Sequence, residues 1–127
     1  MYLFVIGRML FGGFFLMSGY KHIKNIKMMA GYASSKGVPM PMVATFVTGV
    51  LLLLGGAGVV LGIFVKFSLA CLAIFLVGVT LKMHDYWNLE DPTQKMSQQV
   101  NFNKNVALLG AVLMFLAIPL PWAVALF

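Results

Sequence analysis

Long apolar runs alternate with short polar stretches along this chain, and four of the runs are long enough to cross a bilayer as helices. They cover about residues 2–22, 41–64, 67–87 and 103–127. One helical crossing takes about 20 consecutive apolar residues. Only Val65 and Lys66 separate the second run from the third, so we expect these two to form a tight antiparallel hairpin. The pattern predicts an all-α fold, a four-helix transmembrane bundle that makes one domain of residues 1–127.

The two longer polar stretches, after the first and third runs, also carry helical signals. In "KHIKNIKMMAGYASSKG", lysines recur on one face and apolar residues on another, which suits a short helix lying in the membrane interface, with Gly37 placed to end it. In "EDPTQKMSQQVNF", Asp91 can cap a helix that has Pro92 at its first position. We therefore predict a short interfacial helix in each loop, the second leading into the fourth run, where Pro119 and Pro121 break or kink the last turns.

Composition supports a membrane location. Apolar residues make up 61% of the chain and charged residues 9%, whereas a soluble domain has about 45–50% and about 25%. So few charges could not cover the surface of a soluble protein of this size. The start of the chain lacks a basic segment and a small-residue cleavage site, so we interpret it as a retained first span and not as a signal peptide.

The positive charges are unevenly distributed between the two ends of the predicted spans. The loops after the first and third spans carry Lys21, Lys24, Lys27, Lys36, Lys82, Lys95 and Lys104. The opposite side has only Lys66 and the nearest end of Arg8. Positive residues favour the cytoplasmic side, so we predict both long loops in the cytoplasm and both termini outside. The net charge of +6 is then a match for anionic lipid and does not indicate a nucleic-acid partner.

Arg8 is a charged residue about 10 Å into the first span. A charge at this depth is costly and is a candidate for function. The three acidic residues, Asp85, Glu90 and Asp91, all lie at the opposite membrane end, so we expect none of them to reach Arg8. Its side chain would then either extend to the outer head groups or bind a lipid phosphate or a quinone oxygen. A groove for that ligand is expected beside the helical face that carries Arg8, Gly12, Phe15, Gly19 and His22.

A second group of polar residues lies at the cytoplasmic ends of the first, third and fourth spans: His22, His84, Asp85, Lys104 and Asn105. Antiparallel packing can bring them together. They form either a hydrogen-bonded interfacial network or, with Arg8, a ligand-binding site in which His84 moves protons near neutral pH. Lys82 and Asp85, three residues apart, can also pair with each other. Two histidines and one aspartate at no recognised ligand spacing do not predict a metal site.

The sequence assigns no catalytic residue and no intrinsic cofactor. There is no CxxC pair, phosphate loop, HExxH or GxSxG motif, and Cys71 is the single cysteine. Whether the chain is an enzyme is left open, since redox chemistry would need a borrowed cofactor or partner. The second span carries Gly55, Gly58 and Gly62 on one face, which suits either packing inside the bundle or a homo-oligomer interface.

Five segments in order resemble the DoxX family of small bacterial membrane proteins: "IGRMLFGGFFLMSGYKHI", "YASSKGVPMPMVA", "LLLGGAGVVLGIF", "HDYW" and "NFNKN". The resemblance implies a four-helix transmembrane bundle in the bacterial inner membrane. It also implies an association with quinone-linked redox or oxidative-stress systems, since the family is named from a thiosulfate:quinone oxidoreductase. The family's recurring positions correspond here to Arg8, Gly19, Pro39, Gly55, Gly56, His84, Trp87, Phe102, Lys104 and Asn105.

Three functions compete at this point. The first is an accessory subunit of a quinone-linked redox complex, which binds a quinone or lipid and docks a protein partner on its basic loops. The second is a small transporter or lipid-handling protein, although Thr45 and Thr48 alone give the second span a poor polar path. The third is a membrane scaffold or assembly factor, for which the glycine-rich face suffices.

Overall fold

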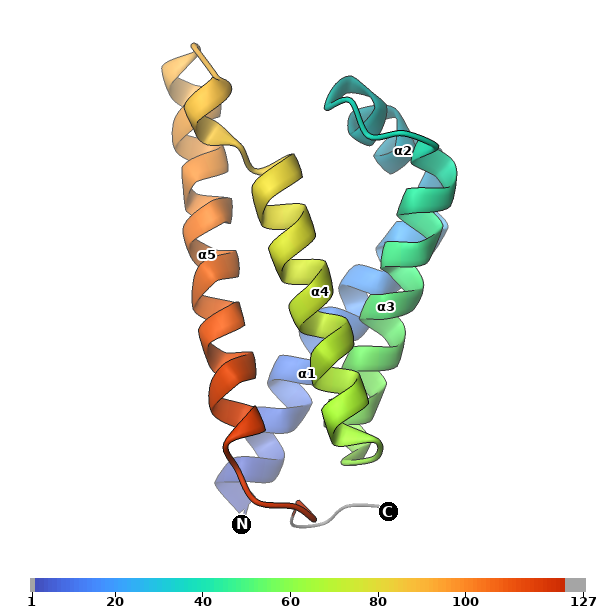
Figure 1. Cartoon of the computed structure of the whole chain (residues 1–127), viewed down its shortest axis with the longest axis vertical. Coiled ribbons are helices and arrows are strands. Elements are labelled where there is room, and N and C mark those ends of the chain that lie inside the picture. Colours follow the sequence, from blue (N-terminus) through green and yellow to red (C-terminus); the bar gives the residue numbers. More distant parts are fainter. Residues whose placement is uncertain (1, 123–127) are drawn as a thin grey trace.

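The computed structural model describes residues 2–122, and over these residues the chain is all-helical. The elements in chain order are α1 (Tyr2–Lys24), α2 (Ile26–Ser35), α3 (Pro41–Leu61), α4 (Val65–Met83), the 3-10 helix η1 (Tyr86–Asn88) and α5 (Pro92–Leu116). The helices α3 and α4 form the predicted hairpin and diverge toward the opposite end, where α2 lies (Figure 1). The first three predicted spans thus correspond to α1, α3 and α4, and the first predicted interfacial helix to α2.

Among the described residues, three segments are long and apolar enough to cross a membrane: Tyr2–Lys24, Pro41–Leu61 and Val65–Asn88. The fourth predicted run differs from the structure. The predicted interfacial helix and this run are one continuous helix, α5, which begins at Pro92 and ends at Leu116. Its first half is rich in Gln, Asn and Lys, so that its apolar part begins only at Val106. The predicted residues 123–127 lie outside the part of the chain that the structure describes.

The start and end of α5 follow the local sequence. The side chain of Asp91 accepts a hydrogen bond of 3.0 Å from the backbone N–H of Thr93, as a helix cap does, and Pro92 occupies the first helical position. At the other end the helix stops three residues before Pro119, whose ring excludes a continuing helix. The predicted cap and the predicted break are both confirmed.

Glycine contacts bring α1 and α3 together. A Cβ atom added to Gly12 would lie 2.7 Å from the carbonyl oxygen of Gly56, and one added to Gly19 would lie 2.9 Å from that of Gly49. Neither distance leaves room for a side chain, so the two backbones are in direct contact. We call this contact the glycine seam.

The other glycines of α3 pack against α4. A Cβ atom at Gly55 would meet Leu72, and one at Gly58 would meet Ser68. Gly62 ends α3 in the left-handed conformation, with φ of 71°. The glycine face of the second span therefore serves packing inside the chain, and the alternative of an oligomer interface is wrong for Gly55 and Gly58.

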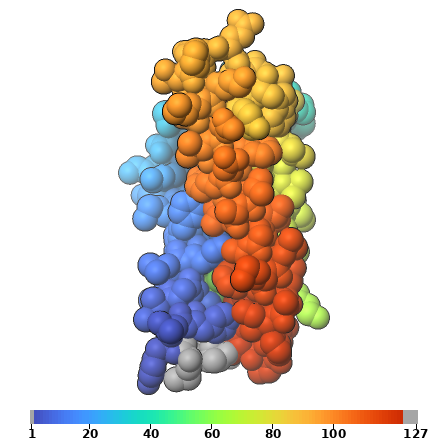
Figure 2. All heavy atoms as spheres, turned by 90° about the vertical axis from the view of Figure 1, so that its left-hand side faces the viewer, coloured from blue at the N-terminus to red at the C-terminus, as the bar shows by residue number. Residues whose placement is uncertain are grey.

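Aromatic rings join α1 to α5, whose outer surfaces lie side by side in Figure 2. Phe11 and Phe115 meet edge to face with ring centroids 4.8 Å apart, and Phe4 and Trp122 do so at 5.2 Å. The buried core between the helices consists of Phe15, Leu52, Val59, Val65, Leu69, Leu72, Leu76, Val112 and Trp122.

Candidate functional site

A cavity of about 740 Å³ lies where α3 and α4 diverge, at the end of the molecule that carries α2. Its wall includes residues from all five α-helices and is mainly apolar, formed by such residues as Phe14, Leu51, Ile74, Phe75 and Val79. The volume lies within the roughly 300–1,000 Å³ that small-molecule sites occupy in proteins. It is large enough for one lipophilic molecule.

The polar part of the cavity wall contains four of the six residues that the sequence predicted as ligand-binding: His22, His84, Lys104 and Asn105. They come from α1, from the residue after α4, and from α5, as antiparallel packing of these elements requires. Asp85 is next to His84 in the chain but is not part of the wall, and Arg8 lies toward the other end of the molecule. The structure thus brings four predicted residues together and separates two.

Further polar residues of the wall were missed as site residues, among them Ser18 and Lys82. Ser18 stands four residues before His22, so both lie on the same face of α1, and that spacing was a usable signal. Lys82 was noted only as a partner for Asp85. Its Nζ atom lies 3.8 Å from the position that a Cβ atom would take at Gly37, so its side chain reaches toward the α2–α3 connection.

Each histidine of the cavity is held through its Nδ1 atom. In His22, Nδ1 lies 2.8 Å from the backbone oxygen of Ser18, and in His84 it lies 2.7 Å from Oε1 of Gln98 on α5. Both oxygens can only accept, so Nδ1 carries the hydrogen in each ring. Within residues 2–122 the structure gives neither Nε2 atom a hydrogen-bond partner. The rings are therefore oriented by the protein, with one nitrogen each left for another molecule.

Asn105 is a buried polar residue of the cavity. The residue is 5% exposed and forms part of the wall, as does the equally buried Thr45. No hydrogen bond among the described residues uses the amide group of Asn105. The fully buried side-chain atoms without a partner among the described residues are Thr80 Oγ1 and Trp122 Nε1, so the amide atoms of Asn105 keep some accessible surface. A ligand in the cavity would supply a partner for this amide.

Asp85 links two parts of the chain instead of facing the cavity. Its Oδ1 lies 2.7 Å from Nζ of Lys36, and its Oδ2 accepts a hydrogen bond of 3.0 Å from Asn88. The ion pair joins the end of α2 to the segment that follows α4. The alternative pairing of Asp85 with Lys82 is wrong. Because both carboxylate oxygens have partners, the side chain of Asp85 stabilises this end of the molecule. Its negative charge is largely compensated by Lys36.

Lys104 lies over an aromatic ring of the cavity wall. Its Nζ atom is 5.4 Å from the centroid of the Phe14 ring, within the range of a cation–π interaction. This contact connects α5 to α1 beside the cavity. A ring face satisfies an ammonium group only in part, so that the three N–H donors of Lys104 remain suited to a polar head group.

Arg8 binds backbone oxygens at the end of α3. Its side chain is 1% exposed, with Nε 3.1 Å from the oxygen of Val59 and Nη2 3.0 Å from that of Val60. These carbonyls belong to the last turn of α3, where the helix offers them no N–H partner. The guanidinium also lies over the rings of Phe4 and Trp122. Its side chain therefore does not extend to the outer head groups, and that alternative is wrong.

The face of α1 that carries Arg8 is buried as expected, since Gly12, Phe15 and Gly19 are buried with it. However, α3 fills part of the space beside this face through the glycine seam. Of this face, Phe15 and His22 line the cavity, so the expected groove exists at that end of α1, whereas Arg8 is not part of the cavity wall. A role of Arg8 in ligand binding stays a prediction.

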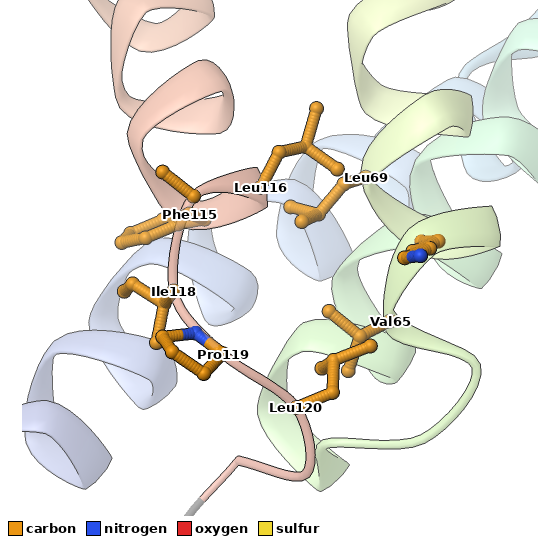
Figure 3. Close-up of a pocket in the computed structure, with 9 residues that line it drawn as sticks. Val65, Leu69, Phe115, Leu116, Ile118, Pro119 and Leu120 are labelled. Carbon is orange, nitrogen blue, oxygen red and sulfur yellow. The ribbon is translucent and has the colours of Figure 1, made fainter.

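A smaller cleft of about 250 Å³ lies at the other end of the molecule, between the start of α4 and the segment after α5 (Figure 3). Val65 and Leu69 form one side, and Ile118, Pro119 and Leu120 form the other. Lys66 is its single charged residue among the described ones. It contains none of the predicted site residues.

Three helices able to span a membrane, packed around an apolar cavity with a polar end, define the chain as a small integral membrane protein. The model of the DoxX family matches residues 3–85, and the chain belongs to this family, as the resemblance indicated. The inner membrane protein YphA of Escherichia coli (strain K12) is 34% identical over 113 residues, which cover 88% of this chain and 79% of that protein. No solved structure matches the chain. The family match includes His22 and His84 and stops before α5, which supplies Lys104 and Asn105.

Proposed function

We propose that this protein holds one lipophilic molecule in the cavity, with the oxygen-bearing head group of that molecule beside His84, Lys104 and Asn105. Asn105 carries the proposal, because this buried residue lines a mainly apolar space of ligand size and its amide has no hydrogen-bond partner among the described residues. A quinone has the required form: an apolar tail for the wall, and ring oxygens that accept hydrogen bonds from the polar end.

The proposal places the chain in the bacterial inner membrane as a four-helix bundle. The helices α1, α3 and α4 cross the membrane, and α5 is the fourth span, with its polar first half toward the cytoplasm. The relative YphA is an inner membrane protein, which supports this location. The lysines at the α2 end, against Lys66 alone at the hairpin, support cytoplasmic loops and external termini.

The role proposed for the bound molecule is that of a quinone in a redox complex to which this chain is an accessory subunit. The single thiol of the chain, Cys71, is buried within α4 and has no second cysteine to pair with. Electrons would therefore pass between the quinone and a partner protein. The basic end of the molecule, with exposed Lys21, Lys24 and Lys27, offers that partner a docking surface.

The test substitutes two glycines that both have open space around them. A Cβ atom at Gly78 or at Gly110 would meet nothing within 4 Å, but only Gly78 is part of the cavity wall. The variant Gly78→Phe therefore fills the cavity, and Gly110→Phe is the matched control. Organic extracts of the proteins, purified from membranes, are compared by mass spectrometry. We expect quinone in wild type and in Gly110→Phe, and a strong loss in Gly78→Phe.

Equal quinone content in all three proteins would contradict the proposal. Lipid handling is the second candidate function, because Ile74 and Gly78 in the wall are exposed and the cavity therefore opens to the outside. The same extracts separate the two functions. A phospholipid or fatty acid that is lost in Gly78→Phe, with no quinone, would favour lipid handling over the redox role.

A further inference from the structure

The charges around the cavity are nearly all of one sign. The charged groups of its wall are the ammonium groups of Lys82 and Lys104. No carboxylate of residues 2–122 forms part of it. Asp85, the nearest by sequence, has its two oxygens 2.7 Å from Lys36 and 3.0 Å from Asn88. The polar end of the cavity therefore presents positive charge that the surrounding chain does not compensate.

The hydrogen-bonding groups of the same wall are mainly suited to an acceptor. The lysines can only donate, and the amide of Asn105 has two N–H donors with no partner among the described residues. By contrast, the hydroxyl groups of Thr45 and Thr48 already donate to carbonyls of their own helix. A head group with several acceptor oxygens would thus find donors from α4 and α5 at once.

A negative head group gains more from this arrangement than a neutral one. A hydrogen bond between an ammonium group and an anionic oxygen is stronger than one between an ammonium group and a neutral oxygen. The apolar part, formed by Phe14, Phe75 and their neighbours, accommodates the tail.

From these observations we infer that the cavity selects lipophilic molecules with an anionic head group, a carboxylate or a phosphate, over neutral molecules with the same tail. The inference rests on the proposed function, because it assumes that the cavity holds a ligand. It adds the charge of the head group, and so favours the second candidate function, the handling of an anionic lipid, over a neutral quinone.

The experiment compares probes that differ only in the head group. Purified wild-type protein in a neutral detergent is incubated with an equimolar mixture of hexadecanol, hexadecanoic acid and hexadecyl phosphate, and bound adducts are measured by native mass spectrometry. The acid and the phosphate report on the two sources of negative charge. We expect one or both to exceed the alcohol about tenfold, the ratio that corresponds to about 1.4 kcal/mol.

Three lysine variants locate the effect. In Lys82→Gln and Lys104→Gln, we expect binding of the anionic probes to fall severalfold more than binding of hexadecanol, so that the preference for the anionic probes is lost. The control is Lys95→Gln, which removes an exposed lysine of α5 that is not part of the wall, and which we expect to behave as wild type.

The outcomes separate this inference from the proposed function. Equal binding of the three probes, or a preference that survives in both Lys82→Gln and Lys104→Gln, would overturn the inference. If the probes nevertheless bind to wild type and to Gly110→Phe but not to Gly78→Phe, the proposed cavity function stands. Binding of no probe to wild type would count against both. A neutral short-tailed quinone that displaces both anionic probes would overturn the inference and support the first candidate function.

Discussion

The polar side chains at the two ends of this molecule differ in their hydrogen-bond partners. At the end near Arg8, the glycine seam brings α1 against α3, and the guanidinium reaches the carbonyls of Val59 and Val60 within 3.1 Å. At the other end the helices diverge, and the buried residue Asn105 lines a cavity, where its amide has no partner among the described residues. Close helix packing satisfies polar groups through the backbone, whereas separated helices leave them available to a ligand.

Removal of Arg8 should have the largest effect, because it breaks the contacts between α1 and the last turn of α3. We expect Arg8→Leu to destabilise the protein by about 3 kcal/mol or more, since it removes two charge-assisted hydrogen bonds and leaves two buried carbonyls without their donor. Thermal unfolding in detergent, followed by circular dichroism, measures the effect. Arg8→Lys keeps the charge but loses the planar guanidinium, so its stability should lie between that of wild type and that of Arg8→Leu. Wild-type stability in Arg8→Leu would show that the contacts at this end are not structural.

A methyl group in the glycine seam should have the next largest effect. A Cβ atom at Gly12 would lie 2.7 Å from the oxygen of Gly56, whereas one at the neighbouring Gly13 would meet nothing within 4 Å. We expect Gly12→Ala to destabilise by about 2 kcal/mol through overpacking. The control Gly13→Ala should be neutral or stabilise by up to about 1 kcal/mol, because alanine favours the helix. Equal unfolding midpoints for the two variants would contradict direct backbone contact at the seam.

Asn105→Leu should have a smaller effect, and one of opposite sign to Arg8→Leu. In protein freed of ligand, the change replaces the unpartnered amide of a buried residue with an apolar group of similar size, so stability should stay constant or rise by about 1 kcal/mol. Retention of copurified ligand should fall at the same time. A marked loss of stability in the ligand-free variant would mean that Asn105 supports the fold and would remove the contrast between the two ends.

The Lys36–Asp85 ion pair should contribute least. The two side chains are 14% and 18% exposed, so water and salt screen their attraction in part. A double-mutant cycle of Lys36→Ala and Asp85→Ala should give a coupling of about 0.5–1 kcal/mol that decreases at high salt. A coupling energy larger than the loss of stability in Arg8→Leu would show that the end with the ion pair is the more strongly stabilised of the two.

Features that depend on local sequence could be predicted well. The buried face of α1, the α3–α4 hairpin, the Asp91 cap and the clustering of His22, His84, Lys104 and Asn105 all follow from helical spacing and antiparallel packing. The continuity of α5 was missed because its polar first half does not resemble a span, although Gln and Lys continue a helix about as readily as Leu.

Features that depend on long-range geometry could not be predicted in the same way. The partners found for Arg8 are backbone oxygens, which every residue has and which therefore leave no mark in a sequence. Lys36 and Asp85 lie 49 positions apart in the sequence. They meet because the folded chain brings the end of α2 to the segment that follows α4. The cavity itself arises from the angle between helices, which the apolar pattern does not encode.

The short apolar part of α5 has a consequence for the surrounding lipid. From Val106 to Leu116 it measures roughly 16 Å at 1.5 Å per residue, about half of the 30 Å hydrocarbon layer of a typical bilayer. With α5 as the fourth span, hydrophobic mismatch on that side of the protein would draw head groups and water inward. The bilayer would then be thinnest next to Lys104, which shortens the distance that an amphiphile must travel from its leaflet to the protein.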